Sequence, residues 1–128
     1  MIALRIVFVL SLAFVSLKAF SSETKCNTCK VLMTNVKEKL PSLSKTSTLL
    51  LEQTMRSVCQ KYVTIQPFEE ICEYVEHKLL DALYMWLAKK EGEIDPELDC
   101  QYMRFCPRSK GFEIFLRLLK VPDVSLHQ

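Results

Sequence analysis

Apolar residues recur at intervals of three and four along most of the chain, and no stretch alternates apolar and polar positions for long enough to predict a strand. A first helix is predicted over Cys26–Leu40, where a lysine-rich outer face opposes the apolar one and Pro41 follows the end. A second helix begins in the Ser/Thr-rich segment Ser44–Thr48, which can supply an N-cap, and reaches Tyr62. These patterns predict an all-α fold.

The third predicted helix has the most regular apolar period in the chain and runs from Pro67, in its first turn, to Lys90. More of its surface is apolar than one core-facing stripe requires. Two interpretations stay open. The helix is buried on two sides, or Tyr84, Met85 and Trp86 form a segment that contacts lipid, because Trp and Tyr favour the membrane interface. Both can hold in a protein that opens.

The C-terminal quarter of the chain predicts two further helices. A short one begins at Asp95-Pro96-Glu97 and reaches about Phe105, and a polar link over Pro107–Lys110 follows it. The segment Gly111–Val121 then carries its charged residues on one narrow stripe, so it either docks on the domain or lies in a membrane interface. We expect the tail, Asp123–Gln128, to fray. The lipid-contact candidates of the last helix are Phe112, Phe115, Leu116 and Leu119.

The N-terminal segment differs from the rest in containing no acidic residue. One cation precedes the apolar run Ile6–Val15, and the small residues of Ala19-Phe20-Ser21 fit a cleavage site before Ser22. The uncharged stretch is shorter than the roughly 20 residues that span a bilayer. Residues 1–21 are therefore predicted to be a secretory signal peptide. We expect the mature protein to be soluble, and either secreted or kept in the lumen of an acidic, lysosome-like vesicle.

Charge and motifs exclude several classes of function. Two of the 17 basic residues, Arg5 and Lys18, lie in the predicted signal peptide, which leaves 15 against 15 acidic ones. A neutral mature chain lacks the field that holds nucleic acid phosphates, so no nucleic acid partner is expected. No GxSxG, HExxH or glycine-rich phosphate loop occurs, and we expect no enzyme activity. Protonation of His77 and His127 would raise the mature charge from 0 to +2, which makes His77 the candidate pH sensor.

Six cysteines in so short a chain predict three disulfides, for which 15 pairings exist. A redox CxxC at the first two lacks a βαβ context. A zinc site would need a second close cysteine pair or a histidine near a cysteine, and the chain has neither, so no metal or cofactor is expected. On a helix, Cys26 and Cys29 share a face and can both reach one partner segment, which the last two cysteines can supply. A bridge between the middle two suits a clasp across consecutive helices. The remaining cysteines are Cys59, Cys72, Cys100 and Cys106.

The spacing Cys-x2-Cys, a gap of 29, Cys, a gap of 12, Cys, a gap of 27 and Cys-x5-Cys resembles that of the saposin-like proteins. The layout is most similar to single-domain amoebapore-like and nematode saposin-like proteins. The resemblance implies the pairs Cys26–Cys106, Cys29–Cys100 and Cys59–Cys72 within a bundle of four to five amphipathic helices. It also implies a saposin-like domain over residues 22–108. The residues that follow, 109–128, are more than a minimal domain of this kind needs, and their own pattern predicts a C-terminal amphipathic helical extension and tail.

By this resemblance, the expected function is to bind membrane lipids, anionic ones included, and to perturb or permeabilise membranes in antimicrobial defence or digestion of microbes. The mature chain lacks the basic excess of strongly cationic members, which keeps two alternatives open. One is a non-lytic protein that binds lipid and presents it to a lipid hydrolase, and the other is a secreted scaffold for protein interactions. A homodimer or higher oligomer is expected if the bundle opens, because exposed apolar faces must be covered.

Overall fold

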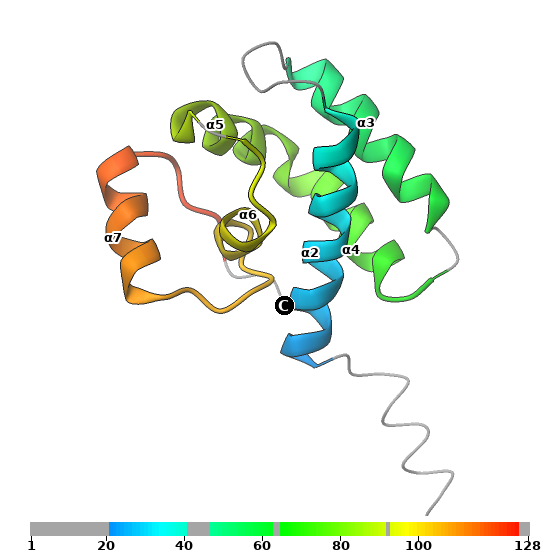
Figure 1. The fold of residues 1–128 in the computed structure, drawn as a ribbon, viewed down its shortest axis with the longest axis horizontal. Helices are drawn as coiled ribbons and strands as arrows, with labels where there is room; N and C mark the ends of the chain where they lie inside the picture. Colours follow the sequence, from blue (N-terminus) through cyan, green and yellow to red (C-terminus); the bar gives the residue numbers. More distant parts are fainter. Residues whose placement is uncertain (1–20, 41–46, 63–64, 92, 126–128) are drawn as a thin grey trace, which may run out of the picture.

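The computed structural model describes residues 21–40, 47–62, 65–91 and 93–125 (Figure 1). All regular structure within these residues is helical, which confirms the predicted all-α fold for this part of the chain. Residues 1–20 of the predicted signal peptide lie outside the described residues. In chain order the elements are α2 (Ser22–Lys39), α3 (Thr48–Lys61), α4 (Phe68–Tyr74), η2 (Val75–Leu79), α5 (Leu80–Lys90), α6 (Pro96–Tyr102) and α7 (Lys110–Leu119).

Four of the helices begin at a side-chain oxygen that accepts a hydrogen bond from the backbone N–H three residues later. The cap of α3 falls inside the Ser/Thr-rich segment where it was predicted, and α6 begins at the predicted Asp-Pro-Glu. Helix α7 begins one residue before its predicted start and ends two residues before its predicted end. The N-cap residues are Ser21, Ser47, Asp95 and Ser109.

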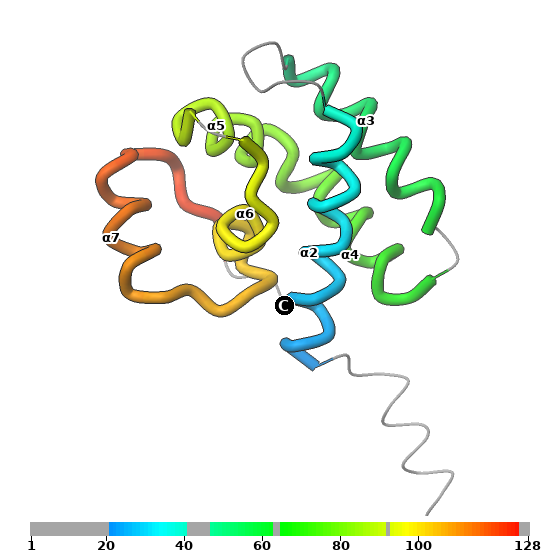
Figure 2. The backbone as a smooth tube through the Cα atoms, in the orientation of Figure 1, coloured from blue at the N-terminus to red at the C-terminus, as the bar shows by residue number. Residues whose placement is uncertain are grey.

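Helix α2 packs against α6 on one side and against α3 and α4 on the other. Helix α6 lies between α2 and the part of the molecule formed by α5 and α7 (Figure 2). Side chains from all these helices meet in one apolar core. No helix of the described residues is both long enough and apolar enough to cross a bilayer. The largest fully buried apolar side chains are Trp86, Tyr102, Leu32, Met33, Leu51, Met55, Leu83 and Met103.

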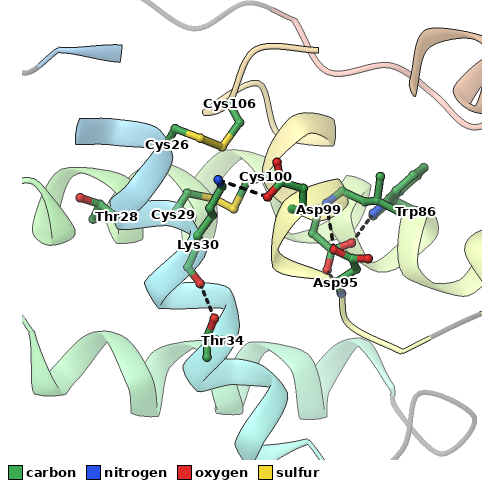
Figure 3. The surroundings of a disulfide bond; sticks show 12 residues. Cys26, Thr28, Cys29, Lys30, Thr34, Trp86, Asp95, Asp99, Cys100 and Cys106 are labelled. Carbon is green, nitrogen blue, oxygen red and sulfur yellow. Dashed lines mark hydrogen bonds and ion pairs between the residues drawn. A yellow bond between two sulfur atoms is a disulfide. The ribbon is translucent and has the colours of Figure 1, made fainter. Parts of the chain in front are cut away.

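Three disulfides cross-link this core, and their pairing is the one that the saposin-like resemblance implies. Cys26–Cys106 and Cys29–Cys100 join α2 to α6 and the turn after it, across 80 and 71 residues of chain (Figure 3). Cys59–Cys72 joins α3 to α4 across 13 residues. On the loop-entropy model, each of the two long-range bridges restricts the unfolded chain by about 4 kcal/mol. Such a set of disulfides is typical of proteins that fold in an oxidising compartment.

The middle of the predicted third helix differs from a regular α-helix. Elements α4, η2 and α5 follow one another without a break, but η2 is a π-helical turn. Val75 and Leu79 at its two ends are both buried, so the apolar pattern continues across the extra residue of the turn. Within the turn, Oε1 of Glu76 is buried and makes no hydrogen bond. The spacing of apolar residues along the sequence does not reveal a π turn whose first and last residues are both apolar.

Candidate functional site

Helix α7 packs on α5 and α6 through an aromatic cluster centred on Trp86. The Trp86 ring stacks on that of Tyr102, with centroids 4.8 Å apart. It also lies 5.6 Å from the ring of Phe112 and 5.9 Å from that of Phe115. Phe112 and Leu116 are themselves buried, at 3% and 6% exposure. One face of α7 therefore closes the core over α5 and α6.

Three of the predicted lipid-contact residues are buried by this packing, and lipid contact by the set stays a prediction. The buried members, Trp86, Phe112 and Leu116, do not face solvent, so α7 takes the docked alternative in this structure. The Trp86 indole N–H has a buried acceptor inside the domain, as a buried tryptophan usually does. The half-buried members are Tyr84, Phe115 and Leu119, and Met85 is exposed.

The acceptor for Trp86 is the fully buried carboxylate of Asp99 (Figure 3). Asp99 Oδ1 accepts hydrogen bonds from Trp86 Nε1 at 2.8 Å and from Lys90 Nζ at 2.7 Å, and Oδ2 accepts one from the Asp95 N–H at 2.9 Å. The Lys90 side chain is only 6% exposed. Burial raises the pKa of Asp99 above its ordinary value, and the Lys90 ammonium opposes that shift. This polar cluster ties the end of α5 to the start of α6.

A second polar cluster, the arginine–aspartate clasp of Arg104, Arg108 and Asp123, holds the segment after α7. The Asp123 carboxylate lies 3.0 Å from the Arg104 guanidinium and 2.7 Å from that of Arg108. Arg104 also donates to the Val124 carbonyl at 2.6 Å, and the Val124 side chain is buried. The prediction that Asp123–Gln128 frays is therefore wrong for residues 123–125, and 126–128 lie outside the described residues.

We expect this clasp to persist at the pH of an acidic vesicle. Hydrogen bonding to Arg108 lowers the pKa of Asp123 below its ordinary value, with the charges of Arg108 and Arg104 acting in the same direction. A carboxyl with a lowered pKa contributes stability above its unfolded pKa of about 3.9, and loses it only as the pH falls through its folded value. Asp123→Asn should then lower the free energy of unfolding by about 1 kcal/mol at both pH 7 and pH 5, as measured by urea denaturation. A penalty present at pH 7 but absent at pH 5 would contradict this.

The opposite side of α7 is exposed. Ile114 and Leu118, one helical turn apart, are 59% and 74% exposed. Lys110 and Arg117 are exposed on the same side of the helix. These four residues are called the outward face of α7. The sequence prediction missed Ile114 and Leu118 as surface residues, because both sides of this helix are apolar. The other exposed large apolar residues of the described ranges are Val31, Leu49, Ile65 and Met85, on other parts of the fold.

The remaining candidates do not form a ligand site with the residues above. His77 is exposed in η2, and its role as a pH sensor stays a prediction. A shallow groove runs beside Ile94 and Leu98, and the ion pair of Lys37 with Glu93, 3.7 Å long, lies at it. Among the described residues, no group of three His, Cys, Asp or Glu side chains is placed to hold a metal ion.

The chain was compared with protein-family models, with curated proteins and with solved structures, and none of them matches. Function is therefore inferred from the cysteine framework and from the surfaces of the described helices.

Proposed function

We propose that this protein is a secreted saposin-like protein that binds membrane lipids and perturbs or permeabilises membranes, in antimicrobial defence or in digestion of microbes. The observation that carries the proposal is the disulfide framework. Two bridges join α2 to α6 and the turn after it, and one joins α3 to α4, on an all-helical bundle. This is the arrangement that the resemblance to saposin-like proteins implies.

The disulfides also bear on where the protein acts. Three bridges persist in an oxidising compartment, either outside the cell or in the lumen of an acidic, lysosome-like vesicle. They also limit how far the ends of the bundle can separate, because α2 and α6 remain covalently joined in any opened form. Membrane action would thus leave this end of the domain intact.

One observation favours a second candidate function. Residues 22–128 carry 15 basic and 15 acidic side chains, so the mature protein lacks the general attraction to anionic membranes that a cationic lytic protein has. A non-lytic protein that binds lipid and presents it to a lipid hydrolase does not need that attraction. This candidate uses the same lipid-binding surfaces and differs in leaving the bilayer intact.

The experiment that tests both candidates combines pelleting and dye release with the oxidised mature chain, residues 22–128. Vesicles of phosphatidylcholine, with and without phosphatidylserine, are used at about pH 5 and pH 7. Binding with release supports membrane permeabilisation, whereas binding without release favours lipid presentation. If the protein neither binds vesicles nor releases dye, both candidates are refuted and a scaffold for protein interactions remains. The reduced and alkylated chain is the control for a requirement for the cross-linked fold.

A further inference from the structure

We propose that α7 is the element that contacts the membrane, and that its outward face docks on surfaces of anionic phospholipid while its inward face stays bound to the domain. This inference rests on the proposed function and adds to it the contact surface and the class of lipid. The four residues of the outward face are Lys110, Ile114, Arg117 and Leu118.

The first argument is that α7 has two apolar sides and the fold uses one. Phe112 and Leu116 point into the core, and at 3.6 residues per turn Ile114 and Leu118 point away from it. A surface helix of a globular protein needs one apolar face for docking. Leu118 is the most exposed large hydrophobic residue in the described ranges, at 74%. The second apolar side is therefore available for a partner.

The second argument is charge. Lys110 and Arg117 lie together along one side of Ile114 and Leu118. Glu113, the one acidic residue of α7, has its carboxylate 3.7 Å from the Arg108 guanidinium. The outward face thus presents cations beside apolar side chains. That combination suits a helix lying in a lipid interface, where apolar side chains enter the acyl boundary and cations meet anionic headgroups. A second copy of the chain, docked symmetrically on this face, would instead bring the cations of both copies together.

The third argument is that the helix is held at both ends. The Ser109 hydroxyl caps its first turn by accepting from the Phe112 N–H. Beyond its last turn, the arginine–aspartate clasp fixes the chain to the domain. A surface that is ordered before binding loses less conformational entropy when it docks. The outward face therefore meets the bilayer as a preformed surface.

The test is a pair of matched double variants of the oxidised mature chain. Ile114→Ser with Leu118→Ser removes the apolar part of the outward face, and should weaken partition onto phosphatidylserine-containing vesicles about tenfold or more. The control is Leu49→Ser with Ile65→Ser, which removes two exposed apolar side chains elsewhere and should leave partition unchanged. Equal thermal unfolding of both variants and the wild type shows that the fold is intact.

A gain of affinity can be tested at Gly111. A Cβ placed on Gly111 would meet only the Ser109 hydroxyl oxygen, at 3.9 Å, so a larger side chain fits there. Gly111 is exposed on the same side of α7 as Leu118. Gly111→Leu enlarges the apolar surface and should tighten partition about threefold or more. A charge reversal, Arg117→Glu, should weaken it and reduce its dependence on salt.

The outcomes separate the two proposals. If the wild type binds vesicles and the Ile114/Leu118 variant binds equally well, the outward face is not the contact surface, although the proposed function stands. If the wild type binds no vesicle of either composition, the proposed function fails and this inference fails with it. Equal binding to neutral and anionic vesicles overturns the lipid class. If these substitutions instead dissociate a dimer that binds no vesicles, the face is an interface between copies.

Discussion

Replacing Asp99 with alanine is expected to lower the free energy of unfolding by about 3–5 kcal/mol, because it leaves a buried charge without its partner. The Lys90 ammonium, on a side chain 6% exposed, loses its carboxylate at 2.7 Å. The N–H groups of Trp86 and Asp95 lose the same acceptor. Trp86 is the only tryptophan in the chain, so its fluorescence follows the cluster directly during urea denaturation.

The control for this prediction is a double-mutant cycle with Lys90→Met. Removing the ammonium together with the carboxylate leaves no unpaired buried charge, so the double variant should lose less stability than the sum of the two single variants. Additive losses would show that Asp99 and Lys90 do not interact in the folded state.

The stability of the Lys90→Met variant is expected to depend on pH. Burial raises the pKa of Asp99, and loss of the Lys90 ammonium removes the largest opposing influence. A carboxyl whose pKa is raised by folding is protonated more readily in the folded state, so the stability of Lys90→Met rises as the pH falls through that pKa. Its penalty relative to the wild type should therefore shrink from pH 7 toward pH 4. A penalty that grows over this range would mean that protonation of Asp99 does not stabilise the variant.

Much of the fold follows from signals that act over a few residues. The Ser47 cap and the Asp95 cap both lie where polar residues precede an apolar helical period, so α3 and α6 begin as predicted. The π turn at Val75–Leu79 lies outside such rules, since both of its ends are apolar and buried. Whether a helix takes in one extra residue depends on which neighbours its side chains must meet, and these are set by tertiary packing.

The candidate site was less predictable because its determinants are far apart in the sequence. In α7, the pairs Phe112/Leu116 and Ile114/Leu118 have the same spacing and similar polarity, so the pattern could not tell the docked side from the exposed one. The docked side is determined by Trp86, more than twenty residues earlier in the chain, because its ring packs on Phe112. One local signal was available. A carboxylate beside a cysteine in a short helix, as at Asp99, is a residue that needs a partner if that helix is buried.

The tail shows the same limitation. The residues that hold Asp123 are Arg104 and Arg108. They lie 19 and 15 residues before it in the chain. A terminal segment of mixed composition after a proline is commonly frayed unless something ties it down. Here guanidinium groups hold the segment, and their neighbours in the sequence alone predict that these groups are exposed to solvent.

Trp86→Ala should also lower the free energy of unfolding by about 3–5 kcal/mol, the cost of removing a large aromatic side chain from a packed core. This loss of stability should differ between parts of the molecule. Phe112 and Phe115 of α7 pack around this ring, and no disulfide joins α7 to the domain, so α7 should open before the disulfide-linked helices do. Hydrogen exchange in the folded variant should then show faster exchange for α7 amides than for those of α2. Trp86→Phe retains a ring but not the N–H bonded to Asp99, and should cost less.

A freed α7 would also reverse the roles of its two faces at a membrane. In Trp86→Ala, the side chains of Phe112 and Leu116 lose their packing partner and become available to lipid, so vesicle binding should rise rather than fall. The effect of the Ile114/Leu118 substitutions should shrink in that background, because the helix can turn its larger apolar face to the bilayer. If Trp86→Ala leaves α7 protected and vesicle binding unchanged, α7 is held to the domain by contacts other than this aromatic cluster, with the arginine–aspartate clasp the first to test.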